Sequence, residues 1–171
     1  MKNITIGFSK PRSKWTILSW IIRKIEKVPF SHVYVKFRSD SLDRDIIYQA
    51  SGTSVNFVGS PRFHESSMTV EEYTFEVSDV IYRSIIQYAI DNAGKPYGKR
   101  ELIGMGLVRA AALFGKNIKN PFRDGESSYI CVELAGVLLW TAGLIKDATE
   151  LESIGLSGFY QLMKDLNHEI N

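Results

Sequence analysis

The 171-residue sequence contains little cysteine and histidine, and neither sign of charge dominates it. Its single cysteine excludes an intrachain disulfide and a cysteine-rich metal site, and its three histidines lack ligand-type spacing. With 21 basic and 19 acidic residues, the net charge of +2 is too balanced to predict nucleic acid as the main partner. No apolar run reaches the roughly 18 residues of a membrane span. The sequence therefore predicts no metal, no cofactor, no nucleic acid and no transmembrane segment.

The length and composition fit a single domain covering residues 1–171. The chain is 44% hydrophobic and 23% charged, which is ordinary for a globular protein with one sizeable core. Met1 to Lys10 lacks an apolar stretch long enough for a signal peptide. We therefore expect a cytoplasmic protein, or a virion-associated one if a phage encodes it. The oligomeric state stays open at this stage.

The first half of the chain alternates apolar and polar residues, which is typical of half-buried strands. Strands are predicted at Ile4–Phe8, Ser31–Arg38, Ile46–Ala50, Val55–Val58 and Val70–Val77. Between the first two strands, Trp15 to Lys27 is predicted to be a helix, because Leu18, Ile21 and other apolar residues recur at helical spacing. His64 is expected on the surface, in the polar loop Phe63 to Ser67.

The second half of the chain has helical periodicity. Helices are predicted at Asp79–Lys95, Glu101–Phe114, Tyr129–Ile145 and Ser157–Asn167, with a loop at Gly115–Glu126. Strands followed by helices indicate an α+β fold rather than a doubly wound sheet. We expect a small antiparallel sheet that packs on helices, one of which carries the cysteine.

Cys131 lies near the start of the most apolar predicted helix. Ser127 and Ser128 precede it and can supply an N-cap, and Gly143 stands where a C′ glycine ends a helix. The helix dipole and the free backbone N–H groups of a first turn favour an anion, so we expect a lowered thiol pKa. A cysteine hydrolase presents its nucleophile in this way. The alternative is an inert core cysteine, because free cysteine is among the most buried residue types.

A thiol nucleophile needs a base and a polar group that orients the base. His32 lies at the start of a predicted strand, with its side chain on the face opposite that of Val33 and Val35. From there it could face the helix that carries the cysteine. Gln49 lies on the next predicted strand, so an antiparallel pairing could bring its amide oxygen to the second ring nitrogen of His32. Glu133, the lone charge in its helix, is expected to be a structural hydrogen-bonding partner.

Four motifs together resemble a known family. They are Ser31-His32-Val33, then Ile47-Tyr48-Gln49-Ala50 with Gly52 and Val55, then Gly94-Lys95-Pro96-Tyr97, and Tyr129 to Leu134 with Gly143. Their order resembles the circularly permuted papain-like cysteine hydrolases. This is the branch of the NlpC-type superfamily that contains the YiiX-like proteins and, more distantly, lecithin:retinol acyltransferase. In that branch the histidine precedes the cysteine, as it does here.

The resemblance implies a permuted papain-like fold and a role for each motif residue. Cys131 would be the nucleophile, His32 the general base and Gln49 the orienting group. Tyr97 would line the substrate pocket, and Tyr34, on the same strand face as His32, is a second candidate for the pocket. YiiX-like relatives often carry a glutamate where Gln49 stands, but papain uses an amide in this role.

The sequence therefore predicts a cysteine hydrolase that cleaves an amide through an acyl-enzyme, with a cell-wall peptide as the first substrate class by resemblance. One alternative is a thioesterase or acyltransferase that acts on lipid-like acyl substrates. Another is a non-catalytic binding module with the same fold. A basic helix edge is predicted to be a solvated face, with contact to a membrane surface, the cell wall or another anionic polymer as the alternative. The edge consists of Lys14, Arg23, Lys24 and Lys27.

Overall fold

The computed structural model describes residues 1–13, 17–98, 130–146 and 154–170, together with single positions between 104 and 118. The predicted helix Glu101–Phe114 and loop Gly115–Glu126 lie almost wholly outside these residues, as do Ser127 and Ser128. Among the described helices, none combines the length and the apolar character that crossing a bilayer requires.

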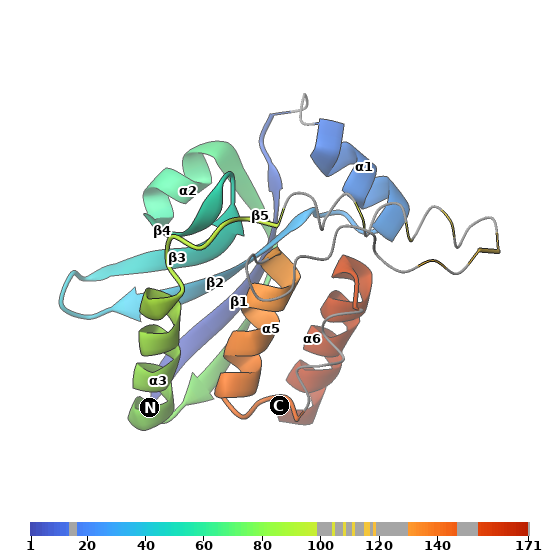
Figure 1. The fold of residues 1–171 in the computed structure, drawn as a ribbon. Helices are drawn as coiled ribbons and strands as arrows, with labels where there is room; N and C mark the ends of the chain where they lie inside the picture. Colours follow the sequence, from blue (N-terminus) through green and yellow to red (C-terminus); the bar gives the residue numbers. More distant parts are fainter. Residues whose placement is uncertain are drawn as a thin grey trace.

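The centre of the fold is a five-stranded antiparallel sheet (Figure 1). Its strands are β1 (Lys2–Pro11), β2 (His32–Ser39), β3 (Arg44–Ser51), β4 (Ser54–Gly59) and β5 (Ser67–Val77). They lie in the order β4-β3-β2-β1-β5, and every neighbouring pair is antiparallel. The predicted α+β class with an antiparallel sheet is confirmed. Four of the five predicted strands lie within observed ones, and the predicted strand Ser31–Arg38 begins one residue before β2.

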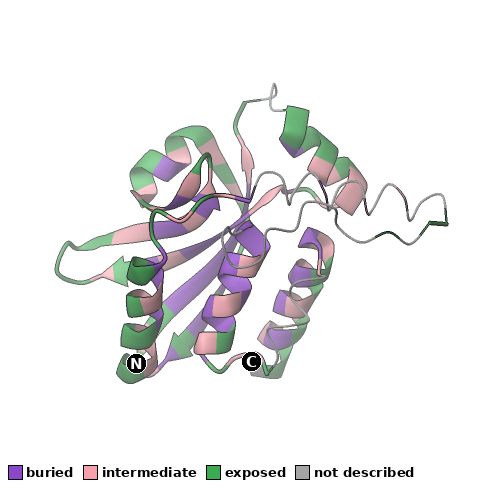
Figure 2. Cartoon of the chain, in the orientation of Figure 1, coloured by how far each residue is buried: buried purple, intermediate pink, exposed green. Residues whose placement is uncertain are grey.

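Three helices cover one face of the sheet and form the main core with it. They are α3 (Asp79–Asp91), α5 (Cys131–Thr141) and α6 (Leu156–Ile170). The sheet contributes Ile4, Ile6 and Val35 to this core, and Leu138 and Phe159 come from the helices. The buried residues accordingly line the inner sides of these helices and the strands behind them (Figure 2). The side chains at alternate strand positions, including Tyr34, point to the opposite face.

The opposite face of the sheet is covered in part by the short helix α2 (Ser60–Ser66). Phe63 of α2 packs on Tyr34 and Ile47 in a second, smaller hydrophobic cluster. The prediction of a polar surface loop around His64 is therefore wrong. Pro61 at the first turn is the signal for a helix that the sequence offered, because proline is favoured there.

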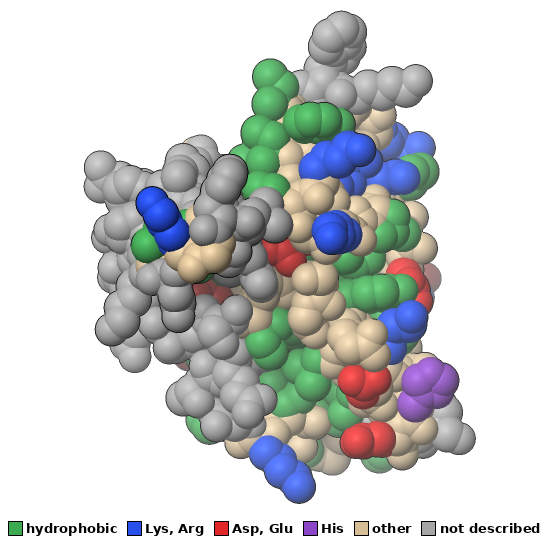
Figure 3. Space-filling view, turned by 90° about the vertical axis from the view of Figure 1, so that its right-hand side faces the viewer, with side chains coloured by type: hydrophobic (Ala, Val, Ile, Leu, Met, Phe, Trp, Pro, Cys, Tyr) green, Lys and Arg blue, Asp and Glu red, His purple; other side chains and the backbone are tan. Residues whose placement is uncertain are grey.

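Helix α1 (Ile17–Glu26) buries only part of the apolar side that its pattern predicts: Ile22 packs against the main core, but other apolar residues of the helix do not. We expected its recurring apolar residues to be buried, but Leu18 is 47% and Ile21 39% exposed, whereas Ser19 is buried. The Ser19 hydroxyl lies 2.6 Å from the Ser31 hydroxyl, which ties the polar side of α1 to the start of β2. Hydrophobic and cationic side chains consequently lie side by side on the surface in the upper part of Figure 3.

Candidate active site

His32 and Gln49 meet in the structure, as the strand pattern predicted. His32 is the first residue of β2, and Gln49 lies near the end of the neighbouring antiparallel strand β3. His32 Nε2 lies 2.8 Å from Gln49 Oε1. Because an amide oxygen only accepts hydrogen bonds, Nε2 carries the proton and Nδ1 keeps its lone pair. The ring is thus held in the tautomer that can accept a proton at Nδ1.

Asn56 fixes the direction of the Gln49 amide, and sequence reasoning missed it. The register of β3 and β4 places Asn56 directly opposite Gln49. Asn56 Nδ2 donates to the carbonyls of Ser54, at 2.9 Å, and Ser51, at 3.4 Å, so its Oδ1 faces Gln49 Nε2 at 3.4 Å. This arrangement leaves Gln49 Oε1 for His32. An asparagine inside a predicted strand was the available signal, since asparagine is depleted from strands.

Cys131 is the first residue of α5, in the first turn as predicted. Ile130 occupies the N-cap position, so the predicted serine N-cap is wrong. Instead, the Ile130 N–H donates to Glu133 Oε2 at 3.2 Å, which confirms a structural hydrogen-bonding role for Glu133. Gly143, with φ of +70°, follows the C-cap residue, as expected for a C′ glycine. The helix therefore begins with the thiol.

The expected lowering of the thiol pKa does not occur in this structure. Burial of Cys131, which is 7% exposed, raises the pKa of its thiol, and the nearby carboxylate of Glu133 acts in the same direction. The backbone N–H groups of Val33, Val132 and Cys131 itself oppose the increase, but burial outweighs them. The helix start supplies the expected amides, but the burial that the apolar helix sequence indicated has the larger effect on the thiol pKa.

Burial acts on His32 in the opposite direction. It lowers the pKa of the imidazole from 6.5 to about 4, and the hydrogen bond that His32 Nε2 donates to Gln49 offsets only part of this change. Both groups are therefore neutral near pH 7. In this state the thiol is not ionised and the imidazole is free to accept a proton.

The thiol and the imidazole lie on adjacent parts of the fold without a direct hydrogen bond in the described structure. The Cys131 sulfur interacts with the backbone N–H of Val33, the residue that follows His32. Helix α5 packs on the sheet face that carries Val33 and Val35, not on the face that carries His32. The prediction that the His32 side chain faces the cysteine helix is therefore wrong.

A cavity of about 680 Å³ opens beside His32 and Gln49. Its lining combines serine hydroxyls with apolar side chains and two cations. Among the lining residues that the structure describes, the cations are Lys10 and Arg62, and none is a carboxylate. Arg62 also contacts Glu65 at 2.5 Å, whereas Lys10 forms no ion pair with the residues that the structure describes. The cavity is suited to a substrate with an apolar part and a neutral or anionic polar part.

Tyr97, the residue predicted for the substrate pocket, lines this cavity. The segment that carries it pairs with the start of β4: the Tyr97 N–H donates to the Thr53 carbonyl at 3.0 Å, and Pro96 forms a bridge with Ser54. Gly94, with φ of +88°, makes the turn from α3 into this segment. The Gly94 to Tyr97 motif thus has a defined structural role, which is to place the tyrosine ring at the cavity.

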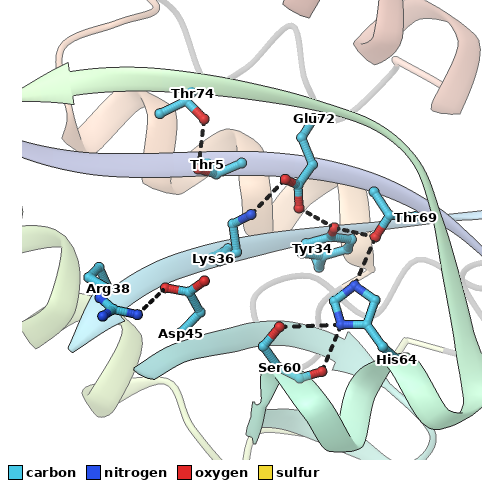
Figure 4. Close-up of polar contacts among 10 residues, drawn as sticks. All are labelled: Thr5, Tyr34, Lys36, Arg38, Asp45, Ser60, His64, Thr69, Glu72 and Thr74. Atoms are coloured by element: carbon cyan, nitrogen blue, oxygen red, sulfur yellow. Dashed lines mark hydrogen bonds and ion pairs between the residues drawn. The ribbon is translucent and has the colours of Figure 1, made fainter. Parts of the chain in front are cut away.

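Tyr34 does not line the cavity, and sequence reasoning placed it there incorrectly. It is 1% exposed, and its hydroxyl donates to Glu72 Oε1 at 2.6 Å and lies 2.9 Å from Thr69 Oγ1 (Figure 4). Thr69 Oγ1 also lies 3.1 Å from His64 Nε2, and His64 Nδ1 donates to the Ser60 carbonyl at 2.7 Å. This network fastens α2, and with it one wall of the cavity, to the sheet.

The lowered pKa of His32 makes stability depend on pH. In the unfolded chain His32 binds a proton near pH 6.5, whereas in the folded chain it does so near pH 4. We therefore expect the free energy of unfolding to fall as the pH drops through this window, by up to about 3 kcal/mol. Urea denaturation between pH 7 and pH 4 measures it. In His32→Gln, the free energy of unfolding should change less steeply with pH. Equal slopes in both proteins would show that His32 does not cause the pH dependence.

Comparison of the sequence with family models gives no match, and comparison with curated proteins gives none either. The function proposed below therefore depends on the site geometry and on the order of the motifs in the sequence.

Proposed function

We propose that this protein is a cysteine hydrolase with a permuted papain-like arrangement, in which Cys131 is the nucleophile, His32 the base and Gln49 the orienting group. The observation that carries the proposal is the 2.8 Å contact between His32 Nε2 and Gln49 Oε1, which leaves Nδ1 unprotonated beside a cavity. A surface histidine without a chemical role does not need its tautomer fixed by the Gln49 amide, which Asn56 in turn holds in place. The sulfur at the start of α5, next to the residue that follows His32, is the second supporting observation.

The proposed reaction begins with both groups neutral. Because burial disfavours a lone thiolate and a lone imidazolium, the two charges must form together, after the sulfur has turned towards His32 Nδ1. The proton passes from Sγ to Nδ1 as the sulfur attacks the acyl carbonyl. The developing oxyanion accepts from the backbone N–H of Cys131 at the helix start.

The second half of the reaction returns the enzyme to its starting state. Collapse of the tetrahedral intermediate breaks the bond to the leaving group, which takes the proton from His32 and departs as an amine, an alcohol or a thiol. The acyl group stays on the sulfur as a thioester. His32 then removes a proton from water, and the resulting attack releases the acid and the free thiol.

An amide of the cell-wall peptide type is the first substrate class that we propose, from the motif resemblance. The cavity lining favours a second class, lipid-like acyl esters or thioesters. Leu18, Ile22 and Phe63 give it apolar walls, and Lys10 supplies a cation for an anionic end of the substrate. Both classes use the same nucleophile and base, so the acyl-enzyme is common to them.

A non-catalytic binding module is the competing function, and the raised thiol pKa and the missing Cys131–His32 hydrogen bond favour it. Acyl-enzyme trapping separates the two. The protein is mixed with p-nitrophenyl acetate, quenched in acid and analysed by intact-mass spectrometry. We expect one acetyl group on Cys131, absent from Cys131→Ala and strongly reduced in His32→Ala. Equal acetylation of the native protein and His32→Ala would contradict the proposal.

A further inference from the structure

The exposed side of α1 carries a stripe of large apolar side chains. Ile17, Trp20 and Ile21 follow one another at helical i, i+3, i+4 spacing, and they are 74%, 55% and 39% exposed. Leu18, beside this stripe, is 47% exposed. A stripe with this spacing ordinarily faces a protein core. Here it faces away from the domain.

The opposite side of α1 is held by polar contacts, so its orientation is well determined. Ser19 is buried against Ser31. Glu26 Oε2 accepts from the hydroxyl of Ser157 at 2.8 Å and from its backbone N–H at 3.2 Å, which connects α1 to the start of α6. Rotating the helix to bury its apolar stripe would break these contacts. The apolar stripe is therefore an outward-facing feature of the folded domain.

Cations accompany the apolar stripe. Lys24 is exposed and lies one helical turn after Trp20 and Ile21, on the same side of α1. Lys27, just beyond the helix end, is also exposed. Glu26, the carboxylate of this helix, is engaged by Ser157. The outward side of α1 thus combines apolar and cationic groups without an exposed carboxylate of its own.

We propose that the outward side of α1, formed by Ile17, Trp20, Ile21 and Lys24, docks the protein on the surface of an anionic lipid bilayer. An amphipathic helix binds a bilayer interface by burying its apolar face at the headgroup boundary while its cations contact anionic lipids. Tryptophan is favoured at this depth because its ring is apolar and its N–H is polar. Charge complementarity identifies the occupant as an anionic surface.

A second copy of the chain fits this surface less well. A two-fold symmetric contact places the same patch on both subunits, so the cationic patch of one copy, with Lys24 and Lys27, would meet a patch of the same sign. An anionic bilayer instead neutralises them. Docking through α1 also brings the cavity close to the lipid, because Leu18 and Ile22 belong both to α1 and to the cavity wall. The docking proposal does not depend on a catalytic role for Cys131.

Vesicle sedimentation tests the proposal. The full chain is mixed with vesicles of phosphatidylcholine alone, or of phosphatidylcholine with phosphatidylglycerol, and the pelleted fraction is measured. We expect binding to the anionic vesicles and little binding to the neutral ones. Lys24→Glu should weaken binding to the anionic vesicles about thirtyfold, since each cation near such a surface contributes about 1 kcal/mol and the substitution changes the charge by two units. Ile17→Ser/Trp20→Ser should abolish it.

Trp140→Ser is the matched control, because Trp140 is 52% exposed on α5, away from α1. Its binding should equal that of the native protein. The proposal is overturned if the native protein does not sediment with anionic vesicles, or if Trp140→Ser weakens binding as much as the α1 variants do. A native dimer that Ile17→Ser/Trp20→Ser converts to a monomer in sedimentation velocity would also overturn it, in favour of a second copy as the occupant.

Discussion

Gly7→Ala is expected to destabilise the protein by at least about 3 kcal/mol, at the upper end of what overpacking costs. Gly7 lies on β1 directly opposite Tyr34 of β2. A Cβ at this position would overlap the outer part of the Tyr34 ring, since it would lie 2.1 Å from Cζ and 2.4 Å from Cε2. The ring cannot move aside, because it packs on Phe63 and its hydroxyl contacts Glu72 and Thr69. Urea denaturation measures the loss.

Two variants separate this clash from a general cost of replacing glycine. Gly52→Ala introduces a Cβ where φ is +69° but no atom lies within 4 Å, so it should cost only about 1–2 kcal/mol. Tyr34→Leu removes the ring that the new Cβ meets. In the double variant Gly7→Ala/Tyr34→Leu, the loss should be clearly smaller than the sum of the single losses. Additive losses would show that Tyr34 is not the obstacle.

His32→Ala is expected to slow the hydrolysis of an activated acyl ester at neutral pH by about 100-fold or more. This is the usual contribution of a positioned general base, and the buried Cys131 thiol has a raised pKa, which leaves little thiolate without help. The release of p-nitrophenol from p-nitrophenyl acetate measures the rate. The effect should appear in kcat rather than in KM, because proton transfer belongs to the transition state.

His168→Ala provides the matched control, since His168 is an exposed histidine on α6. Its rate should equal that of the native protein, which excludes an exposed histidine elsewhere on the surface as the catalyst. If His32→Ala retained the native rate while Cys131→Ala lost all activity, Cys131 would act without His32 and the proposed pair would be wrong.

The sheet could be predicted well because its signal is local. Alternation within a strand identifies its buried face from the sequence alone, as in Ile4, Ile6 and Phe8 of β1, all of which are fully buried. The ends of the elements were less predictable. Strand β5 begins at Ser67 rather than Val70, and α3 ends at Asp91 rather than Lys95, because pairing partners and caps decide where an element stops.

The candidate site could be predicted only in part, because its chemistry depends on distant segments. The His32–Gln49 contact followed from two neighbouring strands, which the sequence could indicate. The depth at which Cys131 is buried depends on how α5 packs against the sheet, and it reverses the expected change in the thiol pKa. Similarly, the orientation of α1 is set by Ser19 and Glu26, whose partners lie on β2 and α6.

The pH dependence of Cys131 alkylation by iodoacetamide tests the central claim most directly, and the single cysteine makes the reaction unambiguous. In the native protein, the rate should rise as His32 loses its proton near pH 4 and should stay level through neutral pH. In His32→Ala, the alkylation rate should be low at neutral pH and rise only above roughly pH 8.5, the pKa of free cysteine. If both proteins gave the same late rise, His32 would not act on the thiol, Cys131 would be a core residue, and the binding-module function would replace the hydrolase.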